Sequence, residues 1–341
     1  MKLLQAMAGA RHGGAEAFFE RLAPALARAG VAQHLVIRRD PDRAARLRAQ
    51  GMAVEELAFG GALDLFTGPR LAAAMRRFAP DLTLVWMNRA ARFLPRRPGM
   101  VTVGRLGGYY DLKYYRRCDH LVGNTPDLRD WIVAQGWPAA RTHYLPNFAA
   151  DDPAPPLPRA ACATPEGVPV LLALGRLHRN KAFDVLLAAL ARLPDAVLWL
   201  AGEGPERAAL EAQADRLGVA GRVRFLGWRD DARALLAAAD LFVCPSRHEP
   251  LGNVVIEAWA AARPVVACAS QGPAQLIADG VDGRLVPVDD DEALAAAIGG
   301  LLADPARARA LAQAGRAAFE ARFTEAAVVA AYRDLFARIV G

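Results

Sequence analysis

Short apolar runs alternate with amphipathic, alanine- and arginine-rich stretches along residues 1–148. Apolar runs bounded by polar turns are typical of buried strands, and amphipathic stretches are typical of helices that cover a sheet. Strands are predicted over Lys2–Met7, Gln33–Ile37, Leu82–Trp86, Met100–Val103, His120–Val122 and Thr142–Leu145. Helices are predicted over Gly14–Ala29 and Pro69–Phe78. This alternation predicts a parallel, doubly wound α/β sheet.

A proline-rich segment follows, with seven prolines among residues 146–169. Because proline has no amide hydrogen and fixes φ, this density opposes regular structure and predicts a linker. The alternation then resumes. Strands are predicted over Val170–Leu174, Val197–Ala201, Val223–Phe225, Leu241–Val243, Pro264–Ala267 and Leu285–Val286. Helices are predicted over Phe183–Arg192, Glu206–Leu217, Ala232–Ala238 and Asn253–Ala261, and along the alanine-rich tail 291–340. The chain is therefore predicted to hold two Rossmann-like domains, 1–148 and 170–325, a linker at 149–169 and a last helix at 326–341.

The composition agrees with two globular domains. At 341 residues the chain exceeds what a single core usually carries. A hydrophobic content of 54% with 23% charged residues is that of an ordinary soluble protein. The four cysteines show no Cys-x-x-Cys spacing, and three lie beside or within apolar runs. We therefore expect buried, reduced thiols and a reducing cytoplasm.

The first eight residues resemble a secretion signal, down to an Ala-x-Ala. Their apolar stretch is only about seven residues long and is broken by Gln5, at or below the lower limit for a signal core. A buried first strand that runs into a glycine loop is the better interpretation. No segment has 18 apolar residues without a charge, so no membrane span is predicted.

The charges are distributed unevenly. Residues 1–150 hold 22 Lys and Arg against 12 Asp and Glu, a net charge of +10. Residues 151–341 hold 20 basic against 24 acidic residues, a net charge of −4. We therefore expect the basic half to face an anionic membrane surface, an acidic acceptor, or both.

Two carboxylates, Glu249 and Glu257, stand eight positions apart with an apolar helical run behind them. In one continuous helix they would lie roughly 80° apart. The better interpretation begins the helix near Gly252 or Asn253, which leaves Glu249 in a loop and Glu257 about one turn inside the helix. The unpaired N–H groups at the helix start suit a phosphate, and a carboxylate one turn in can accept two hydroxyls of a ribose. Those N–H groups belong to Leu251, Gly252 and Asn253. The pattern suggests a nucleotide diphosphate.

These residues resemble the Glu-x7-Glu signature of retaining glycosyltransferases of family 4, which have the GT-B fold. The signature is accompanied by Leu-Phe-Val-Cys-Pro-Ser before it, and by Ala-Arg-Pro-Val-Val-Ala and Ile-Ala-Asp-Gly-Val-Asp-Gly-Arg-Leu-Val-Pro after it. The likeness covers nearly the whole chain and is strongest from Val170 to Val288. It implies two Rossmann-like domains facing a central cleft, with donor bound mainly by the second, acceptor by the first, and the last helix crossing back to the first. The alternative for the Glu pair is a solvated acidic pair on a structural helix.

The run Gly-Arg-Leu-His-Arg-Asn-Lys at 175–181 follows directly on a predicted strand. It resembles the family loop in which an arginine and a lysine, here Arg176 and Lys181, bind the donor pyrophosphate. Cations at that place stabilise the charge that builds on the leaving nucleoside diphosphate. Lys181 is one of only three lysines against 39 arginines, although a solvated loop charge is the alternative. The family's glycine after the lysine is Ala182 here, so the local backbone is less free.

Further donor contacts are implied at two loops and one aromatic residue. Gly13 and Gly14 open a predicted helix, where glycines let the backbone approach a ligand; a plain turn is the alternative. Gly202 lies in a strand-end loop like that of the family. Trp228 resembles the residue that frames the nucleotide base, and packing is an equally supported role for it.

A run between residues 105 and 117 combines tyrosines with cations, and four of the six tyrosines fall within seven residues. Aromatic rings beside cations suit sugar stacking, acidic acceptor groups or a lipid headgroup interface, and an ordinary amphipathic helix is the alternative. The candidate acceptor or membrane residues are Arg105, Tyr109, Tyr110, Lys113, Arg116 and Arg117. The tract 105–125, with residues 142–147, resembles a subset of bacterial enzymes that act on lipopolysaccharide or other cell-surface glycans.

Two positions depart from the family pattern. Many members carry a histidine after the strand at 100–103, where this chain has Gly104 and Arg105, so no histidine role is carried over. His120 is expected to be structural. Gln275 stands where the family has a glutamate after the second Glu of its signature, which leaves a charged contact to the donor sugar in question.

Together these features predict a retaining, metal-independent glycosyltransferase that uses a nucleotide diphosphate sugar and a glycan or lipid-linked acceptor in cell-surface polysaccharide synthesis. Its catalytic residues are predicted to be Arg176, Lys181 and Glu249. No metal and no cofactor are expected, because the cations and helix N-termini take the place of a divalent ion. A cytoplasmic position on the anionic inner face of the membrane is expected, and no nucleic acid partner. A GT-B epimerase or phosphorylase and a non-catalytic GT-B sugar-binding subunit are the alternatives.

Overall fold

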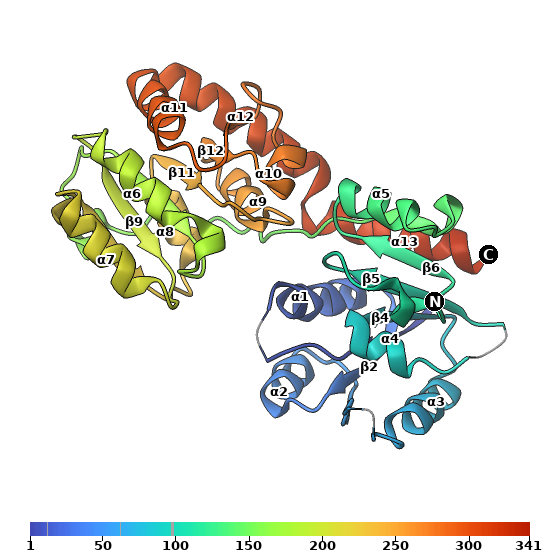
Figure 1. Ribbon diagram of the computed structural model, residues 1–341. Coiled ribbons are helices and arrows are strands. Elements are labelled where there is room, and N and C mark those ends of the chain that lie inside the picture. The colour runs from blue at the N-terminus through green and yellow to red at the C-terminus, as the bar shows by residue number, and fades with distance from the viewer. Residues whose placement is uncertain (12, 62, 97–98) are drawn as a thin grey trace. The chain divides into compact units, whose positions relative to one another are not determined.

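The structure is a computed structural model that describes residues 1–11, 13–61, 63–96 and 99–341. The chain divides into two compact units. The first comprises Met1–Asn147 with Glu325–Gly341, and the second comprises Phe148–Thr324. Each unit is a parallel sheet covered by helices (Figure 1).

The first unit is a seven-stranded parallel sheet with strand order β3-β2-β1-β4-β5-β6-β7. Its strands are β1 (Lys2–Met7), β2 (Ala32–Arg38), β3 (Val54–Leu57), β4 (Leu82–Trp86), β5 (Val101–Leu106), β6 (His120–Gly123) and β7 (Thr142–Tyr144). Its α-helices are α1 (Gly14–Arg28), α2 (Pro41–Ala49), α3 (Thr67–Phe78), α4 (Met87–Phe93), α5 (Pro126–Ala134) and α13 (Glu325–Val340). Two 3-10 turns complete it, η1 (Leu112–Tyr115) and η2 (Ala139–Arg141).

The central strands of this sheet are mostly apolar because helices cover both faces. In β1 every residue after Lys2 is buried, including the polar Gln5. The Gln5 amide is satisfied, since it donates to Gln33 Oε1 at 2.6 Å and accepts from Trp86 Nε1 at 2.8 Å. A buried amide with both partners in place agrees with a first strand rather than a signal core.

The second unit is a six-stranded parallel sheet with strand order β10-β9-β8-β11-β12-β13. Its strands are β8 (Val170–Leu174), β9 (Val197–Ala201), β10 (Val223–Gly227), β11 (Leu241–Cys244), β12 (Val265–Cys268) and β13 (Arg284–Val286). Its α-helices are α6 (Phe183–Ala191), α7 (Arg207–Arg216), α8 (Ala232–Ala238), α9 (Asn253–Ala260), α10 (Gln271–Leu276), α11 (Asp291–Ala303) and α12 (Pro305–Arg322). The 3-10 turns are η3 (Arg159–Cys162), η4 (Arg179–Lys181) and η5 (Ala220–Arg222).

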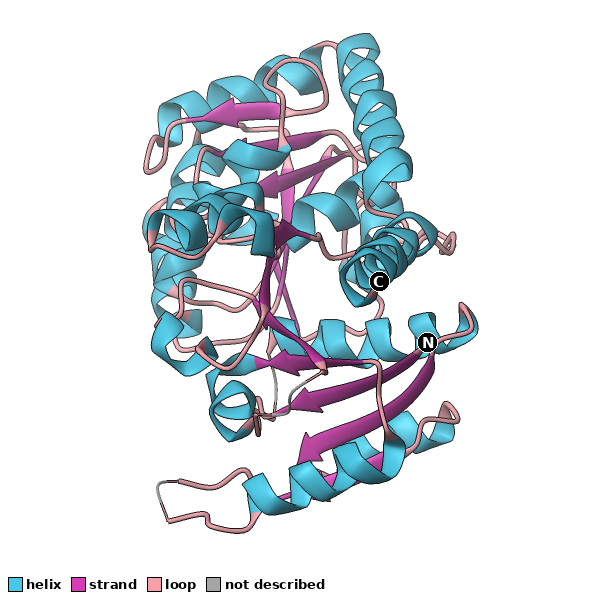
Figure 2. Ribbon diagram, turned by 90° about the vertical axis from the view of Figure 1, so that its right-hand side faces the viewer, coloured by secondary structure: helices cyan, strands magenta, loops and turns pink. Residues whose placement is uncertain are grey.

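Alternate residues of these strands supply two cores, one on each face of the sheet. Leu171 and Ala173 belong to the cluster that α6 and α11 cover, whereas Val170 and Leu172 belong to the cluster that contains Trp259 of α9. Figure 2 shows the strands as a layer between helices. The predicted class, α/β of the GT-B type with two Rossmann-like sheets, is confirmed at the level of each sheet.

The bounds of the predicted strands lie within three residues of the observed ones, and the largest difference is at the end of β5. The hydrophobic pattern does not predict β3, because its sequence Val-Glu-Glu-Leu has no apolar run. It also misses α2, α4, α5 and α10, which are short. The alanine-rich tail is helical as predicted, and it forms three helices, α11, α12 and α13.

The proline-rich segment 149–169 belongs to the second unit rather than standing apart as a linker. Its only regular element among the described residues is η3. Leu157 donates its N–H to the carbonyl of Ala234 at 3.1 Å, and Cys162 is buried in the core that contains Trp259. The prolines prevent helix and strand, but they do not prevent packing of the apolar side chains between them.

The last helix, α13, belongs to the first unit and packs on α1. It buries Val328, Tyr332 and Phe336. At its start, Glu325 forms an ion pair with Arg28 of α1 at 2.5 Å. A helix from the end of the chain therefore completes a core that the first 147 residues begin.

All four cysteines, Cys118, Cys162, Cys244 and Cys268, are buried and free, as predicted. Burial raises the pKa of each thiol, to about 11 at Cys244 and about 12 at Cys268. In the part of the chain that the structure describes, no helix is both long and apolar enough to cross a membrane.

Candidate functional site

The side chains of Lys181 and Glu249 meet at the carboxyl edge of the second sheet. Lys181 ends η4, which follows β8, and Glu249 lies in the loop that follows β11. Because β8 and β11 are parallel neighbours, the loops at their carboxyl ends lie together. A hydrogen bond of 3.1 Å from the N–H of His248 to the carbonyl of Asn180 joins the two loops. Lys181 Nζ and Glu249 Oε2 form an ion pair, so two of the three predicted catalytic residues are in direct contact.

This ion pair is largely shielded from water. The Glu249 side chain is 11% exposed and the Lys181 side chain 23%. The second carboxylate oxygen of Glu249 accepts a 3.4 Å hydrogen bond from the N–H of Gly252. Since a shielded charge is costly when it is unpaired, each of the two groups fixes the position of the other.

Arg247 braces the same loop and was not among the predicted site residues. Its guanidinium donates to both oxygens of Asp184 at 2.7 and 2.8 Å and to the carbonyl of Arg179 at 3.0 Å, and it pairs with Asp289. Burial opposes ionisation of Asp184, but the hydrogen bonds from Arg247 outweigh it and lower the pKa of that carboxyl. The feature of the sequence that could have indicated this role is the position of Arg247, two residues before Glu249.

Arg176 follows β8 and is exposed. Its guanidinium has no hydrogen-bond or ion-pair partner within the described part of the chain, unlike the ammonium of Lys181. Gly175 before it has a φ of 149°, and a Cβ there would lie 3.2 Å from Cε of Lys181. The glycine therefore leaves the space through which the Lys181 side chain reaches Glu249.

The helix behind Glu249 begins where the sequence predicts. Asn253 is the first residue of α9, and Gly252 before it is left-handed, with a φ of 76°. Glu249 thus lies in the loop, and Glu257 lies in the second turn of the helix. Glu257 lines a pocket of about 400 Å³ together with Arg233 and Arg316. Its role as a ribose acceptor stays a prediction.

Gly202 and Trp228 lie in the neighbouring loops of this edge. The N–H of Gly202 donates to the carbonyl of Gly227 at 2.7 Å, and a Cβ on Gly202 would lie 1.8 Å from the carbonyl oxygen of Gly175. Gly202 therefore lets two loops approach each other, and its amide is already bonded. Trp228 is 75% exposed and donates its Nε1–H to Asp230 at 3.0 Å. Such exposure is not that of a packing residue and suits a face that covers a planar ligand.

Gly13 and Gly14 lie at the start of α1, at the carboxyl edge of the first sheet. The carboxylate of Glu16 folds back over this loop and accepts the N–H of Ala10 at 2.6 Å. A Cβ on Gly9 would lie 2.0 Å from Glu16 Oε1, and one on Gly13 would lie 2.3 Å from Oε2. Gly13 therefore makes room for Glu16, whereas the space around Gly14 is open.

The expectation that Arg105 is a surface residue is wrong. Its guanidinium is buried and lies 4.7 Å from the ring centre of Phe18 and 4.6 Å from that of Trp86. It donates to the hydroxyl of Tyr332 at 2.7 Å and to Asn147 Oδ1 at 2.5 Å. Arg105 therefore ties α13 to β5 and cannot face a membrane.

Tyr109, Tyr110, Lys113 and Arg116 line a pocket of about 570 Å³ in the first unit. The structure adds Trp131, Gln135 and Trp137 to them. The rings of Tyr109 and Trp131 pack edge to face at 5.3 Å, and Tyr109 bonds to Asp127. Burial and this carboxylate raise the pKa of Tyr109 to about 12. Arg117 donates to the carbonyl of Leu94 at 2.8 Å, outside this pocket.

The predicted structural role of His120 agrees with its contacts, because its Nδ1 lies 3.0 Å from Nε2 of His143 on β7. Gln275 donates to the carbonyl of Gln271 within α10 at 2.9 Å. Among the described residues, no group of three or more His, Cys, Asp or Glu side chains is placed to hold a metal ion.

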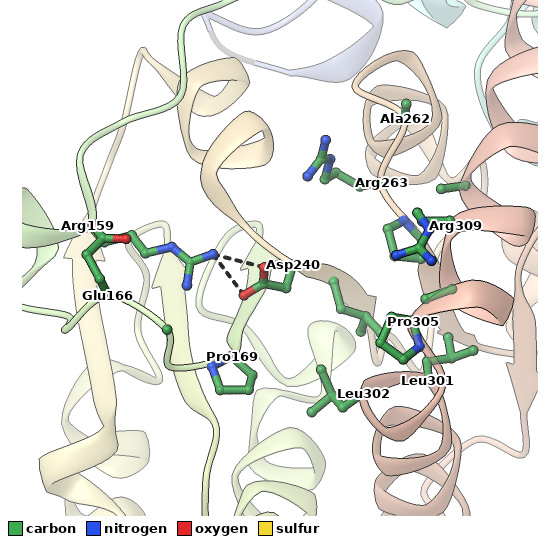
Figure 3. Close-up of a pocket in the computed structure, with 15 residues that line it drawn as sticks. Arg159, Glu166, Pro169, Asp240, Ala262, Arg263, Leu301, Leu302, Pro305 and Arg309 are labelled. Atoms are coloured by element: carbon green, nitrogen blue, oxygen red, sulfur yellow. Dashed lines mark hydrogen bonds and ion pairs between the residues drawn. The ribbon is translucent and has the colours of Figure 1, made fainter.

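A further pocket, of about 580 Å³, lies at the opposite edge of the second sheet (Figure 3). It is lined by Pro169, Asp240 and Pro264, which precede β8, β11 and β12. Arg159 donates to both oxygens of Asp240, at 2.9 and 3.0 Å (Figure 3). Since open α/β sheets bind ligands outside the carboxyl ends of their strands, this pocket is not the candidate for the chemistry.

Comparison with known proteins shows the family to which the chain belongs. Residues 12–152 match the model of Glycosyltransferase Family 4, and residues 168–304 match that of Glycosyl transferases group 1. The chain is 40% identical over 331 residues to the lipopolysaccharide core biosynthesis glycosyltransferase LpsE of Rhizobium meliloti (strain 1021). The aligned region covers 96% of each chain. It is 39% identical over 330 residues to LpsD of the same organism, covering 96% of this chain and 95% of LpsD.

Solved structures share the fold across the chain. Anabaena HepE in complex with UDP superposes with a TM-score of 0.87 at 22% identity, covering 99% of this chain and all of HepE. WaaG, a glycosyltransferase involved in lipopolysaccharide biosynthesis, has a TM-score of 0.70 at 19% identity, covering 97% of this chain and 98% of WaaG. The chain therefore belongs to glycosyltransferase family 4 and is a glycosyltransferase with two Rossmann-like domains of the GT-B type.

Proposed function

We propose that this enzyme transfers a sugar, with retention of configuration and without a metal ion, from a nucleotide diphosphate sugar to a lipid-linked glycan acceptor in lipopolysaccharide core synthesis. The pathway is supported by the names of LpsE and LpsD, lipopolysaccharide core biosynthesis glycosyltransferases to which this chain is similar along nearly its whole length. The donor class is supported by HepE, which has been solved with UDP and with UDP-glucose.

The observation that carries the donor assignment is the set of cations at the carboxyl edge of the second sheet. Arg176 is exposed with no partner in the described chain, and Lys181 is held in place by Glu249. Two positive charges beside the β-phosphate stabilise the negative charge that develops as the bond to the sugar breaks. In other enzymes a divalent ion stabilises this charge, so a site in which two cationic side chains do so requires no divalent ion.

Retention follows if the acceptor hydroxyl attacks the anomeric carbon from the face on which the diphosphate leaves. The bond from the anomeric carbon to the phosphate oxygen breaks, and the bond to the acceptor oxygen forms. The proton of the hydroxyl passes to the departing phosphate oxygen, so no enzymic nucleophile is needed. Glu249 contributes by fixing Lys181 and by offering a carboxylate oxygen to the hydroxyls of the transferred sugar.

The acceptor is assigned to the first unit, where aromatic rings and cations line one pocket. Tyr109 and Trp131 offer apolar faces on which sugar rings stack, and Lys113 and Arg116 offer charge for acidic groups. An enzyme that uses a lipid-linked acceptor works at a membrane surface. We therefore place it on the cytoplasmic side, peripheral to the inner face of the membrane, where its basic half meets anionic lipid.

Donor binding is tested by thermal unfolding in the presence of UDP-, GDP- and ADP-linked sugars. A nucleotide at 100 times its Kd should add about 2.7 kcal/mol to the free energy of unfolding. Glu257→Ala should raise the donor KM, and Glu249→Ala should lower kcat more than it changes the donor KM. Unchanged kinetics in both variants would remove the two glutamates from the site.

Metal independence is tested by turnover in excess EDTA, which should leave kcat unchanged. Loss of activity that Mg²⁺ or Mn²⁺ restores would contradict the proposal. Donor binding without transfer to any glycan would instead indicate a sugar-binding subunit.

A further inference from the structure

The loop between β3 and α3 presents three large apolar side chains to solvent. Leu63 is 93% exposed, Leu65 76% and Phe66 71%. Single exposed apolar residues are common on soluble proteins, but three within four positions of one loop concentrate apolar surface, and exposed apolar patches mark interaction sites. We call these three side chains the apolar tip.

The apolar tip is held in this exposed arrangement by a network around Asp64. The Asp64 carboxylate accepts the N–H groups of Gly60 at 2.6 Å, Phe66 at 3.2 Å and Thr67 at 3.0 Å. It also accepts the hydroxyl of Thr67 at 2.6 Å, and that hydroxyl accepts the N–H of Phe59 at 3.0 Å. The hydroxyl of Thr67 and the N–H of Gly60 lower the pKa of Asp64 to about 2. The carboxylate of Asp64 thus bonds to groups of its own loop and of the start of α3, whereas the three apolar side chains remain exposed to solvent.

The network is anchored in the core of the first unit. Phe59 is buried and packs edge to face on Phe93 of α4, with ring centres 5.9 Å apart. A Cβ on Gly68, in the first turn of α3, would lie 4.0 Å from the carbonyl oxygen of Phe93. The apolar tip therefore sits on a support made by α3 and α4.

Three arginines lie on the two helices of this support. Arg70 lies in the first turn of α3, and Arg89 and Arg92 lie on α4, where Arg89 donates to the carbonyl of Phe59 at 3.3 Å. All three are exposed. None of them forms an ion pair with a carboxylate within the described residues. An apolar projection whose supporting helices carry unpaired cations is complementary to an anionic lipid surface, whose headgroups attract the cations and whose acyl region accepts the apolar groups.

We propose that Leu63, Leu65 and Phe66 insert into an anionic phospholipid leaflet, with Arg70, Arg89 and Arg92 on the lipid phosphates. The assignment names the membrane contact of the proposed function and rests on its lipid-linked acceptor. The loop follows the carboxyl end of β3, the same edge of the first sheet that carries Gly13 and Gly14. Insertion at this edge brings the ligand-binding side of the sheet to the membrane surface where a lipid-linked glycan emerges.

The test is co-sedimentation of the full-length enzyme with vesicles of phosphatidylglycerol and phosphatidylcholine, compared with phosphatidylcholine alone. The variant Leu63→Ser/Leu65→Ser/Phe66→Ser should weaken partitioning to the anionic vesicles at least about tenfold. Val281→Ser is the matched control, because Val281 is an exposed apolar residue, at 62%, of the second unit. It should bind as the wild type does. Equal binding of the triple variant and the wild type would overturn the proposal.

The contributions of the arginines and of the apolar tip to vesicle binding can be distinguished by their dependence on salt concentration. Arg70→Gln/Arg89→Gln/Arg92→Gln should weaken binding about fivefold per arginine at low salt. At 1 M salt, where the Debye length is about 3 Å, this variant should bind no more weakly than the wild type, and the residual binding should depend on the apolar tip. Binding that salt abolishes in the wild type would show adsorption without insertion and would overturn the proposal. Loss of binding in Arg116→Ala/Arg117→Ala but not in the triple serine variant would assign the contact to those arginines instead.

Insertion can be observed directly with an environment-sensitive fluorophore on Leu65→Cys. The four native cysteines are buried with raised thiol pKa values, so the new cysteine should be labelled selectively. Emission should shift to the blue on anionic vesicles, and the same label on Val281→Cys should not shift. An unshifted label at position 65 would overturn insertion, as would a wild-type dimer that the serine variant dissociates, because a second copy would then cover the patch.

Failure of the membrane-insertion proposal can be distinguished from failure of the proposed donor binding. The triple serine variant should keep the wild-type thermal shift with UDP-linked sugars, because the apolar tip lies in the first unit and the proposed donor site in the second. A wild type that binds vesicles through the apolar tip but no nucleotide sugar would contradict the donor assignment and leave the membrane contact standing.

Discussion

At the scale of single residues, the two cations proposed to bind the diphosphate have different environments. Lys181 is shielded and paired with Glu249, whereas Arg176 is exposed and has no partner in the described chain. The two residues should therefore have similar effects on turnover and different effects on stability.

Arg176→Ala and Lys181→Ala are each expected to lower kcat by about 10²-fold, the scale for one preorganised charge contact. Lys181→Ala should also lower the free energy of unfolding by about 1–3 kcal/mol, because it leaves the Glu249 carboxylate shielded and unpaired. Arg176→Ala should leave stability unchanged. Steady-state kinetics and urea unfolding measure both effects.

Arg179→Ala is the control on the same loop, because that side chain is exposed and the bond to Arg247 uses only its backbone carbonyl. It should keep wild-type kinetics and stability. A 10²-fold loss of kcat in this variant as well would show that the loop tolerates no loss of charge. It would contradict specific roles for Arg176 and Lys181.

Gly202→Ala is expected to destabilise the second unit by about 2–4 kcal/mol, from backbone strain and overpacking. The new Cβ would lie 1.8 Å from the carbonyl oxygen of Gly175, at a φ of 148° that side chains rarely adopt. Gly221→Ala is the matched control, since its Cβ would meet no atom within 4 Å. Equal urea midpoints for the two variants would contradict the close approach of the loops.

At the scale of elements, the start of β6 and the middle of β7 are joined by a histidine pair that responds to pH. Burial, then the neighbouring His120 and Arg338 of α13, lower the pKa of His143 from 6.5 to about 4. Burial also lowers the pKa of His120. The folded state therefore binds these protons less readily than the unfolded state does.

Stability should fall as the pH falls from about 6.5 to about 4, because the unfolded chain takes up the proton first. Above pH 6.5 both states are neutral at this site and no effect is expected. His143→Asn should give a shallower decline of the free energy of unfolding across this window, measured by urea unfolding at several pH values. A slope as steep as that of the wild type would assign the decline to other groups.

At the scale of the whole molecule, the proposed donor contacts belong mainly to one unit, although Gly13 and Gly14 lie in the other. Arg176, Lys181, Glu249 and Trp228 all lie within Phe148–Thr324, which has its own sheet and a hydrophobic core on each face. The first unit, in contrast, needs α13 from the end of the chain to cover Arg105.

A fragment of residues 148–324 is therefore expected to fold and to bind the nucleotide sugar without transferring it. Its thermal unfolding should shift with the same nucleotide as that of the full chain, by a similar amount. A fragment of residues 1–147 should be aggregation-prone, because without α13 it leaves part of its core uncovered. A folded 148–324 fragment that ignores every nucleotide bound by the full chain would show that donor binding needs the first unit.

The sequence by itself determined the class of fold, and it supplied the residues of the proposed chemistry. Apolar runs such as Val197–Ala201 specify buried strands wherever they occur, because burial on both faces requires an unbroken apolar segment. The start of α9 at Asn253 was predictable because glycine and a following apolar period mark a helix start locally. Arg176, Lys181 and Glu249 were found through motif spacing, which is also local.

Only the tertiary structure decided what depends on contacts between distant segments. It buried Arg105 through Tyr332, 227 positions away, although the local tract of arginine and tyrosine resembles a surface. It paired Lys181 with Glu249, 68 positions away, and braced their loop with Arg247. It also turned Leu63, Leu65 and Phe66 outward through the hydrogen bonds of Asp64, where an apolar pattern alone favours burial. Hydrophobic periodicity records which residues prefer to be buried, but the partner that satisfies or exposes a side chain is fixed only when the chain has folded.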